Sequence, residues 1–121
     1  MSLLTLGLTH KSLNTPDEIL VYPRSRLHMV TIGEHAIVRA RYEPGWRWSE
    51  HIGPLVGSEL CVLPHLAYHL HGRLRIRMSD GTEIDARPGD LVEVPPGHDA
   101  WVVGSGPAVL LDLIGGDSYT R

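Results

Sequence analysis

Phenylalanine is absent from this 121-residue sequence, and cysteine occurs once, as Cys61. A single cysteine excludes a disulfide within the chain, which favours a reducing compartment, so we expect the protein in the cytoplasm. Positive charge is not in excess, since the formal net charge is −3, and this argues against a nucleic-acid partner. No apolar run approaches the roughly 20 residues of a membrane-spanning helix, so we expect no membrane association.

Glycine and proline are frequent, with 13 and 9 residues. They interrupt the chain at intervals of roughly 8 to 15 residues, which is typical of short antiparallel strands joined by tight turns. The segments rich in β-branched and apolar residues are 27–32, 36–42, 74–78, 91–94 and 109–114. The pattern predicts an all-β sandwich or barrel in a single domain, 1–121, with a barrel core at about 27–114 and an N-terminal arm at 1–26.

The strands around Asp80-Gly81 can be paired in register from their alternation. A two-residue loop would place apolar side chains opposite charged ones. A three-residue loop pairs Ile76 with Ile84 on one face and sets arginines opposite acids on the other. The charged pairs predicted by this register are Arg75 with Asp85 and Arg77 with Glu83.

The strongest helix signal lies near the N-terminus, where Thr15 can cap a helix, Pro16 suits its first position and Glu18 can reach back to complete a capping box. Because Pro23 cannot continue a helix, the sequence predicts at most one or two helical turns there.

Three of the eight histidines stand in turn-to-strand settings: His51, His65 and His98. Each alone is more often structural. Together, in one small β domain, they predict a metal site inside a barrel, because neutral imidazole is the commonest metal ligand in proteins. His65 and His69 share one strand face, and that face is either exposed or lines a polar cavity with these two histidines near its centre.

The segment 44–51 contains two tryptophans, and its alternation would place His51 on the face opposite Trp46 and Trp48. With His51 pointing into the barrel, both tryptophans would lie outside. The N-terminal segment or a second subunit would then cover them, and we expect a homodimer. Cys61, between Leu60 and Val62, is interpreted as a small buried packing residue.

These residues resemble the cupin superfamily of double-stranded β-helix, or jelly-roll, domains. Gly45, five residues and His51 match the start of its first motif, and His65, six residues and Gly72 match its end. A second motif is matched by Gly89, Pro95 and Gly97 at the family's spacing. The resemblance covers roughly residues 36–114 and implies a jelly-roll barrel.

The sequence departs from the family's metal-binding pattern at three positions. Gly53 replaces the second histidine, His65 stands where a glutamate is usual, and Ala100 holds the later histidine position, with His98 two residues earlier. What the resemblance implies is a three-histidine metal site, with His69 as a candidate fourth ligand. The implied ligands are His51, His65 and His98.

An all-nitrogen site favours one zinc or nickel ion per chain, with iron an alternative. His69 is the best candidate for a catalytic base. The sequence leaves three functions open: a metal-dependent enzyme acting on a small polar molecule, a sensor or binding module for a small ligand or metal, and a metal-free structural cupin. The fold by itself cannot decide among them.

Overall fold

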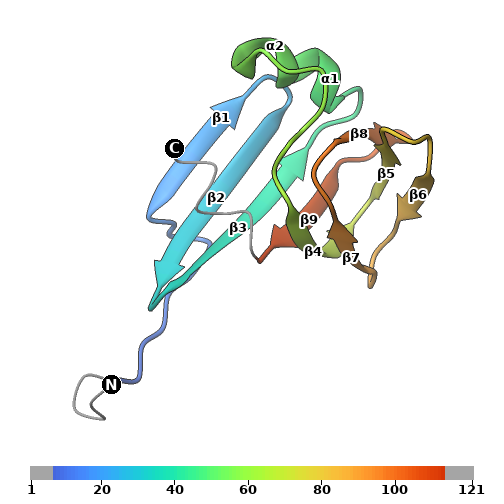
Figure 1. Ribbon diagram of the computed structural model, residues 1–121. Coiled ribbons are helices and arrows are strands. Elements are labelled where there is room, and N and C mark those ends of the chain that lie inside the picture. Colours follow the sequence, from blue (N-terminus) through green and yellow to red (C-terminus); the bar gives the residue numbers. More distant parts are fainter. Residues whose placement is uncertain (1–6, 114–121) are drawn as a thin grey trace.

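The computed structural model describes residues 7–113, which form two antiparallel sheets and two short helices (Figure 1). The larger sheet has the strand order β1-β2-β3-β9-β4-β7, and the smaller sheet has the order β6-β5-β8. The elements are β1 (Glu18–Tyr22), β2 (Ser25–Ile32), β3 (His35–Tyr42), α1 (Trp48–His51), α2 (Gly53–Val56), β4 (His65–His71), β5 (Arg73–Met78), β6 (Glu83–Ala86), β7 (Leu91–Val94), β8 (His98–Val103) and β9 (Ala108–Asp112).

The strands form where β-branched and apolar residues alternate with polar ones. In β3, Val38, Ala40 and Tyr42 are buried while Arg41 is exposed. This period of two turns one face of each strand towards the opposite sheet. The predicted all-β jelly roll is therefore confirmed.

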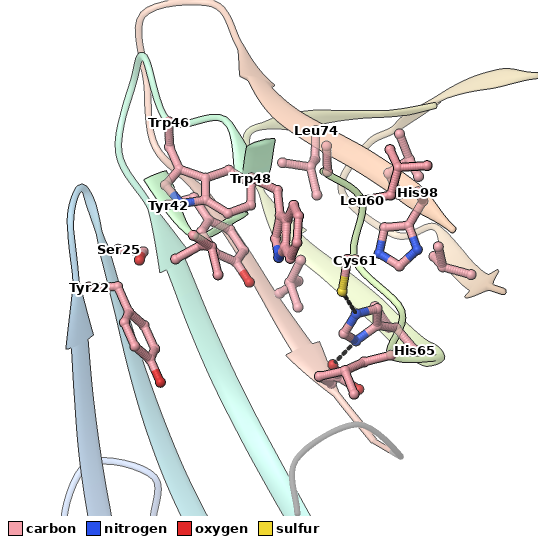
Figure 2. A pocket seen from close by; sticks show the side chains of 18 of the residues that line it. Tyr22, Ser25, Tyr42, Trp46, Trp48, Leu60, Cys61, His65, Leu74 and His98 are labelled. Atoms are coloured by element: carbon pink, nitrogen blue, oxygen red, sulfur yellow. Dashed lines mark hydrogen bonds and ion pairs between the residues drawn. The ribbon is translucent and has the colours of Figure 1, made fainter. Parts of the chain in front are cut away.

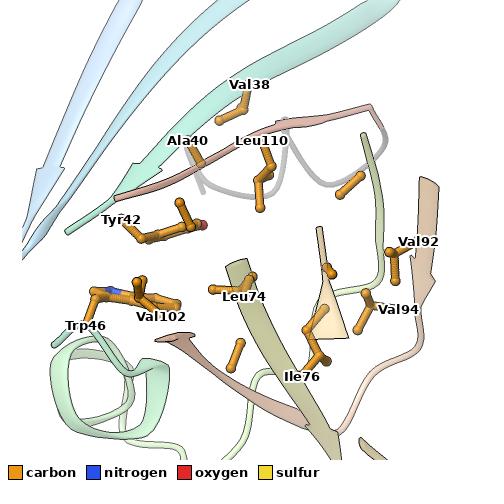
Figure 3. Packing of buried hydrophobic residues seen from close by; sticks show 14 of the residues in the cluster. Val38, Ala40, Tyr42, Trp46, Leu74, Ile76, Val92, Val94, Val102 and Leu110 are labelled. Carbon is orange, nitrogen blue, oxygen red and sulfur yellow. The ribbon is translucent and has the colours of Figure 1, made fainter. Parts of the chain in front are cut away.

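The buried apolar side chains of the two sheets meet between them (Figure 3). Val38 and Leu110 come from the larger sheet, while Leu74, Ile76 and Val102 come from the smaller. Each sheet contributes one face to this core. The core fixes the positions of β4 and β8, whose first residues are His65 and His98.

The hairpin β5–β6 has the predicted register, with Ile76 opposite Ile84 and Arg75 opposite Asp85. Arg75 Nε donates to Asp85 Oδ1 over 2.6 Å, and Arg73 Nη2 donates to Asp85 Oδ2 over 2.8 Å. These bonds hold the pKa of Asp85 well below its usual range. The arginines are therefore paired with a carboxylate, as the register predicted.

The helical turn predicted near Thr15 is not formed. A turn precedes Asp17, and Glu18 begins β1, which pairs along its whole length with β2. Strand pairing here outweighs the local capping signal, because β1 is rich in Ile, Leu and Val. The larger sheet thus extends into the segment 1–26 that the sequence suggested as an arm.

The segment 48–56, in which an extended strand was predicted up to His51, instead folds into α1 and α2, which lie together at one end of the sheets (Figure 1). Asp99 of β8 explains this: its carboxylate accepts hydrogen bonds from Ser49 N at 3.0 Å and from Arg47 Nε at 2.9 Å. A carboxylate at the first turn of a helix satisfies backbone N–H groups that otherwise lack partners. No helix in the range 7–113 has the length and apolarity needed to cross a membrane.

Candidate metal centre

A cavity of about 320 Å³ opens between the sheets beside α1 and α2. Figure 2 shows its two sides: tyrosines and tryptophans on one, and a group of sulfur- and nitrogen-bearing side chains on the other. Most of the remaining lining side chains are aliphatic. The sulfur- and nitrogen-bearing side chains shown there, which could bind a metal, thus lie together at one place on the cavity wall.

That place is formed by Cys61, His65 and His98, whose ligand atoms all lie within 4.8 Å of one another. His65 is the first residue of β4 and His98 the first of β8. Their rings stand edge to face, with centroids 5.2 Å apart. Cys61 Sγ lies 3.6 Å from His65 Nε2. Three potential metal ligands therefore converge from two strand starts and one loop.

Cys61 is brought to the cluster by backbone pairing rather than by a strand of its own. Its N–H donates to His98 O over 2.8 Å, and its carbonyl accepts from Gly97 N over 2.7 Å. Gly97 has φ +92°, a conformation that glycine adopts without strain. The turn before β8 therefore positions both Cys61 and His98.

Each histidine of the cluster is oriented through its Nδ1 atom. His65 Nδ1 lies 2.5 Å from Asp112 Oδ2 at the end of β9, and His98 Nδ1 donates to Pro95 O over 2.8 Å. A hydrogen bond from Nδ1–H orients the ring so that Nε2 is the nitrogen that would ligate a metal. Protein metal sites commonly hold their histidines in this way, with a carboxylate or carbonyl behind the ring.

Burial and neighbours shift the pKa of two members in opposite directions. Burial alone would raise the pKa of Cys61, but its hydrogen bonds with His65 and His98 outweigh burial and lower the pKa to about 6. Burial would lower the pKa of His65, but its bonds with Asp112 and Cys61 raise the pKa to about 9. At neutral pH and without a metal, these shifts favour a thiolate beside an imidazolium. Metal binding would release the His65 proton, because only neutral imidazole is a ligand.

The structure brings together two of the three predicted ligands and leaves His51 apart. His51 lies in α1, where its Nδ1 accepts from Arg47 N at 3.0 Å. It is not among the residues that line the cavity. The reason is the helical fold of this segment, which removes the strand alternation on which the inward direction of His51 depended. In the cluster, Cys61 takes the place predicted for His51.

Cys61 was interpreted from the sequence as a packing residue, and that interpretation missed its position beside two imidazoles. Its spacing of four residues from His65 was the available signal. A cysteine and a histidine four residues apart in a loop before a strand can share a metal, although the spacing alone is weak.

His69 lines the cavity with only 1% of its surface exposed, and neither ring nitrogen has a hydrogen-bond partner among the described residues. Burial lowers its pKa, which favours the neutral ring. Four residues of extended strand separate it from His65 by about 13 Å along the backbone. His69 is therefore remote from the Cys61–His65–His98 cluster on the same cavity wall.

Trp46 and Trp48 line the cavity and do not form an outer face. Trp46 is 3% exposed, and its ring lies 4.0 Å from that of Tyr42, centroid to centroid. The outward placement predicted for the two tryptophans is wrong, since the segment turns into α1 instead of continuing as a strand. The exposed apolar face that suggested a homodimer is accordingly absent at these two side chains.

Comparisons with known proteins identify the fold. A cupin-like protein from Thermotoga maritima has a TM-score of 0.53 and 15% identity, over 74% of this chain and 66% of that chain. The polyketide cyclase RemF from Streptomyces resistomycificus has a TM-score of 0.65 and 12% identity, over 88% and 78%. The Lactobacillus farciminis oxalate decarboxylase, solved as a formate complex, has a TM-score of 0.61 and 19% identity, over 93% and 35%. No protein-family model and no curated protein matches the sequence.

These similarities show that the chain has the cupin fold, as the sequence motifs suggested. At identities below 20% they carry no activity or ligand over to it.

The donor set itself is a test of whether a metal fits. One thiolate and two imidazole nitrogens are ligands that zinc accepts in proteins. All three donors are mostly buried, and both histidines have acceptors behind them. The residues present therefore fit a transition metal, and they fit magnesium or calcium poorly, since those ions prefer oxygen ligands.

Proposed function

We propose that this protein is a metal-dependent cupin that binds one zinc ion through Cys61, His65 and His98 and acts on a small organic molecule in the cavity. The observation that carries the proposal is the convergence of the three donors, with Asp112 and Pro95 orienting the two rings. The thiolate favours zinc over the nickel or iron that an all-nitrogen site would also accept.

Three protein ligands leave a coordination position for water or substrate, as in catalytic zinc sites. When bound, zinc would supply Lewis acidity to an oxygen placed at that position. Other parts of the chain would support this chemistry. Asp112 keeps the His65 ring in position, and the apolar walls exclude water from the bound molecule. We do not propose His69 as a base at the zinc, because about 13 Å of strand separates it from His65 and its ring nitrogens are buried.

We further propose a cytoplasmic location, because Cys61 must stay reduced to bind the metal. A homodimer stays a prediction of the sequence, to be checked by light scattering.

Metal analysis tests the site directly. Tag-free protein purified without chelators should contain about one zinc per chain by mass spectrometry of the metal. Cys61→Ala and His98→Ala should each lose it, whereas His51→Ala should retain it and serves as the matched control. Full zinc occupancy in Cys61→Ala, or its loss in His51→Ala alone, would overturn the ligand assignment. Metal-free protein that shows no thermal shift with added zinc would favour a structural cupin.

A second function is favoured by one observation, the alignment of Cys61, His65 and Asp112 in the order of a nucleophile, base and orienting acid. In such a hydrolase the Cys61 thiolate would attack an ester carbonyl and expel the alkoxide, which takes the His65 proton. Water would then cleave the thioester to acid and thiol.

The backbone limits this alternative, because the Cys61 N–H is committed to His98 O and is not free to stabilise an oxyanion. His98→Ala separates the two functions, since His98 is a zinc ligand in the first and outside the triad in the second. Ester hydrolysis by metal-free His98→Ala at the wild-type rate would favour the hydrolase. A turnover screen with zinc-loaded protein separates an enzyme from a sensor.

A further inference from the structure

The cavity has one polar end and a long apolar remainder. Cys61, His65 and His98 gather at one side, while Tyr42, Trp46 and Trp48 face the cavity from the other (Figure 2). Aliphatic side chains fill most of the wall between them. A ligand that reaches the polar end must therefore place most of its surface against apolar and aromatic groups.

The volume of about 320 Å³ lies at the lower end of the range of about 300–1,000 Å³ that is typical of small-molecule sites. It suits a molecule of one or two rings. Flat aromatic walls favour a flat ligand, because ring–ring contacts add to the gain from burying apolar surface.

Two buried polar groups that line the cavity lack partners among the described residues. The Nε1 atom of Trp46, a donor only, has no acceptor, and both ring nitrogens of His69 are unpaired. Their residues are 3% and 1% exposed. Because these atoms have almost no accessible surface, they do not reach the open cavity, and they place no polar substituent of the ligand.

The cavity also has an apolar rim. Leu55, Val56 and Val62 line it while 61%, 64% and 66% of their surfaces are exposed. Exposed apolar residues grouped at an opening mark a binding entrance more often than chance exposure does. The entrance and the wall of the cavity thus both favour a largely apolar molecule.

We propose that the cavity binds a one- or two-ring aromatic molecule with an oxygen-donor head at the Cys61–His65–His98 end. The position of the head rests on the proposed zinc site, and the choice of an aromatic body does not. This replaces the small polar molecule that the sequence suggested. A polyol would lose its water contacts to an apolar wall without gaining partners.

The test uses 2-naphthoate as the probe, with gluconate and acetate as comparison carboxylates, in isothermal titration of the zinc-loaded full chain. We expect one 2-naphthoate per chain, bound about 100-fold or more tightly than either comparison ligand. Equal or tighter binding of gluconate would overturn the proposal.

Two variants locate the binding. Trp48→Ala should weaken 2-naphthoate about tenfold. Because Trp48 packs against the core, the exposed rim residue provides a second variant that leaves the core intact: Leu55→Glu should weaken binding similarly. Leu91→Glu is the matched control, since Leu91 is 65% exposed and does not line the cavity. Unchanged affinity in both cavity variants would overturn the proposal.

The same titration in metal-free protein separates this inference from the proposed function. If no zinc binds but 2-naphthoate still binds in a manner sensitive to Leu55→Glu, the aromatic cavity is supported and the zinc function and head position are overturned. If zinc binds but 2-naphthoate does not, the inference is overturned and the zinc function stands.

Discussion

The imidazole of His65 lies with its Nδ1 atom 2.5 Å from the Oδ2 atom of Asp112, a residue 47 positions later in the chain. The carboxylate is almost completely buried, with 2% of its side chain exposed. A buried carboxylate behind the ring accepts from Nδ1–H, so Nε2 is the nitrogen that faces Cys61, and the carboxylate makes this ring more basic. This pair connects the end of β9 to the Cys61–His65–His98 cluster.

Replacing Asp112 should weaken zinc binding while preserving the cluster. Asp112→Asn keeps the volume and an acceptor oxygen but removes the charge, so we expect a loss of about 10- to 100-fold in zinc affinity. Competition with a chelating dye measures it. Asp85→Asn, which disturbs a carboxylate on the other sheet, is the control and should bind zinc normally. Wild-type affinity in Asp112→Asn would show that the pair is not needed for the metal.

The reactivity of Cys61 should depend on pH in metal-free protein. Its pKa is lowered to about 6, since His65 and His98 stabilise the thiolate. The thiolate is the reactive form, so alkylation by iodoacetamide should be near its full rate at neutral pH and fall as the pH drops through about 6. His65→Gln should move the midpoint towards the value of about 8.5 for a free cysteine. Mass spectrometry follows the reaction, and saturating zinc should slow it. A wild-type midpoint near that of a free cysteine would contradict the proposed interaction.

Asp99 should be needed for the position of α1. Its carboxylate accepts from Ser49 N, Ser49 Oγ and Arg47 Nε, and the residue is 6% exposed. Asp99→Ala leaves these donors without their acceptor, which should cost about 2–3 kcal/mol in the free energy of unfolding. Urea denaturation measures the loss. Asp80→Ala, in an exposed turn where the carboxylate accepts from Thr82 N, should cost well under half as much. Similar losses in the two variants would argue against an anchoring role for Asp99.

Gly72 should tolerate no side chain, because the strand that carries the site turns at this residue. It has φ +72°, and an added Cβ would lie 2.1 Å from Pro107 O. We expect Gly72→Ala to lower the free energy of unfolding by at least about 3 kcal/mol, from clash and backbone strain together. Gly81→Ala shares a positive φ but has open space around it, and should cost about 1–2 kcal/mol. Chemical denaturation of both would reveal the difference, and equal costs would rule out the close approach to Pro107.

The strands and the hairpin register were predictable because both depend on neighbouring residues. The alternation around Ile76 and Ile84 allowed one pairing, and the structure has it. The same alternation placed His98 on the face of Ala100, and both residues line the cavity. Where the alternation failed, at 46–51, the deciding contact comes from Asp99, about 50 residues away. A local pattern holds no information on such a partner.

The sequence by itself determined the short antiparallel strands, the turns and the strand faces that carry His65 and His98, because side-chain periodicity and turn residues act over a few positions. The resemblance of its motifs added the jelly-roll topology. Only the tertiary structure decided which side chains meet at the site. Cys61 became a candidate ligand through its backbone bonds to the turn before β8, and His51 was removed by the folding of α1. Both outcomes depend on long-range hydrogen bonds, whose partners become neighbours only when the two sheets are packed together.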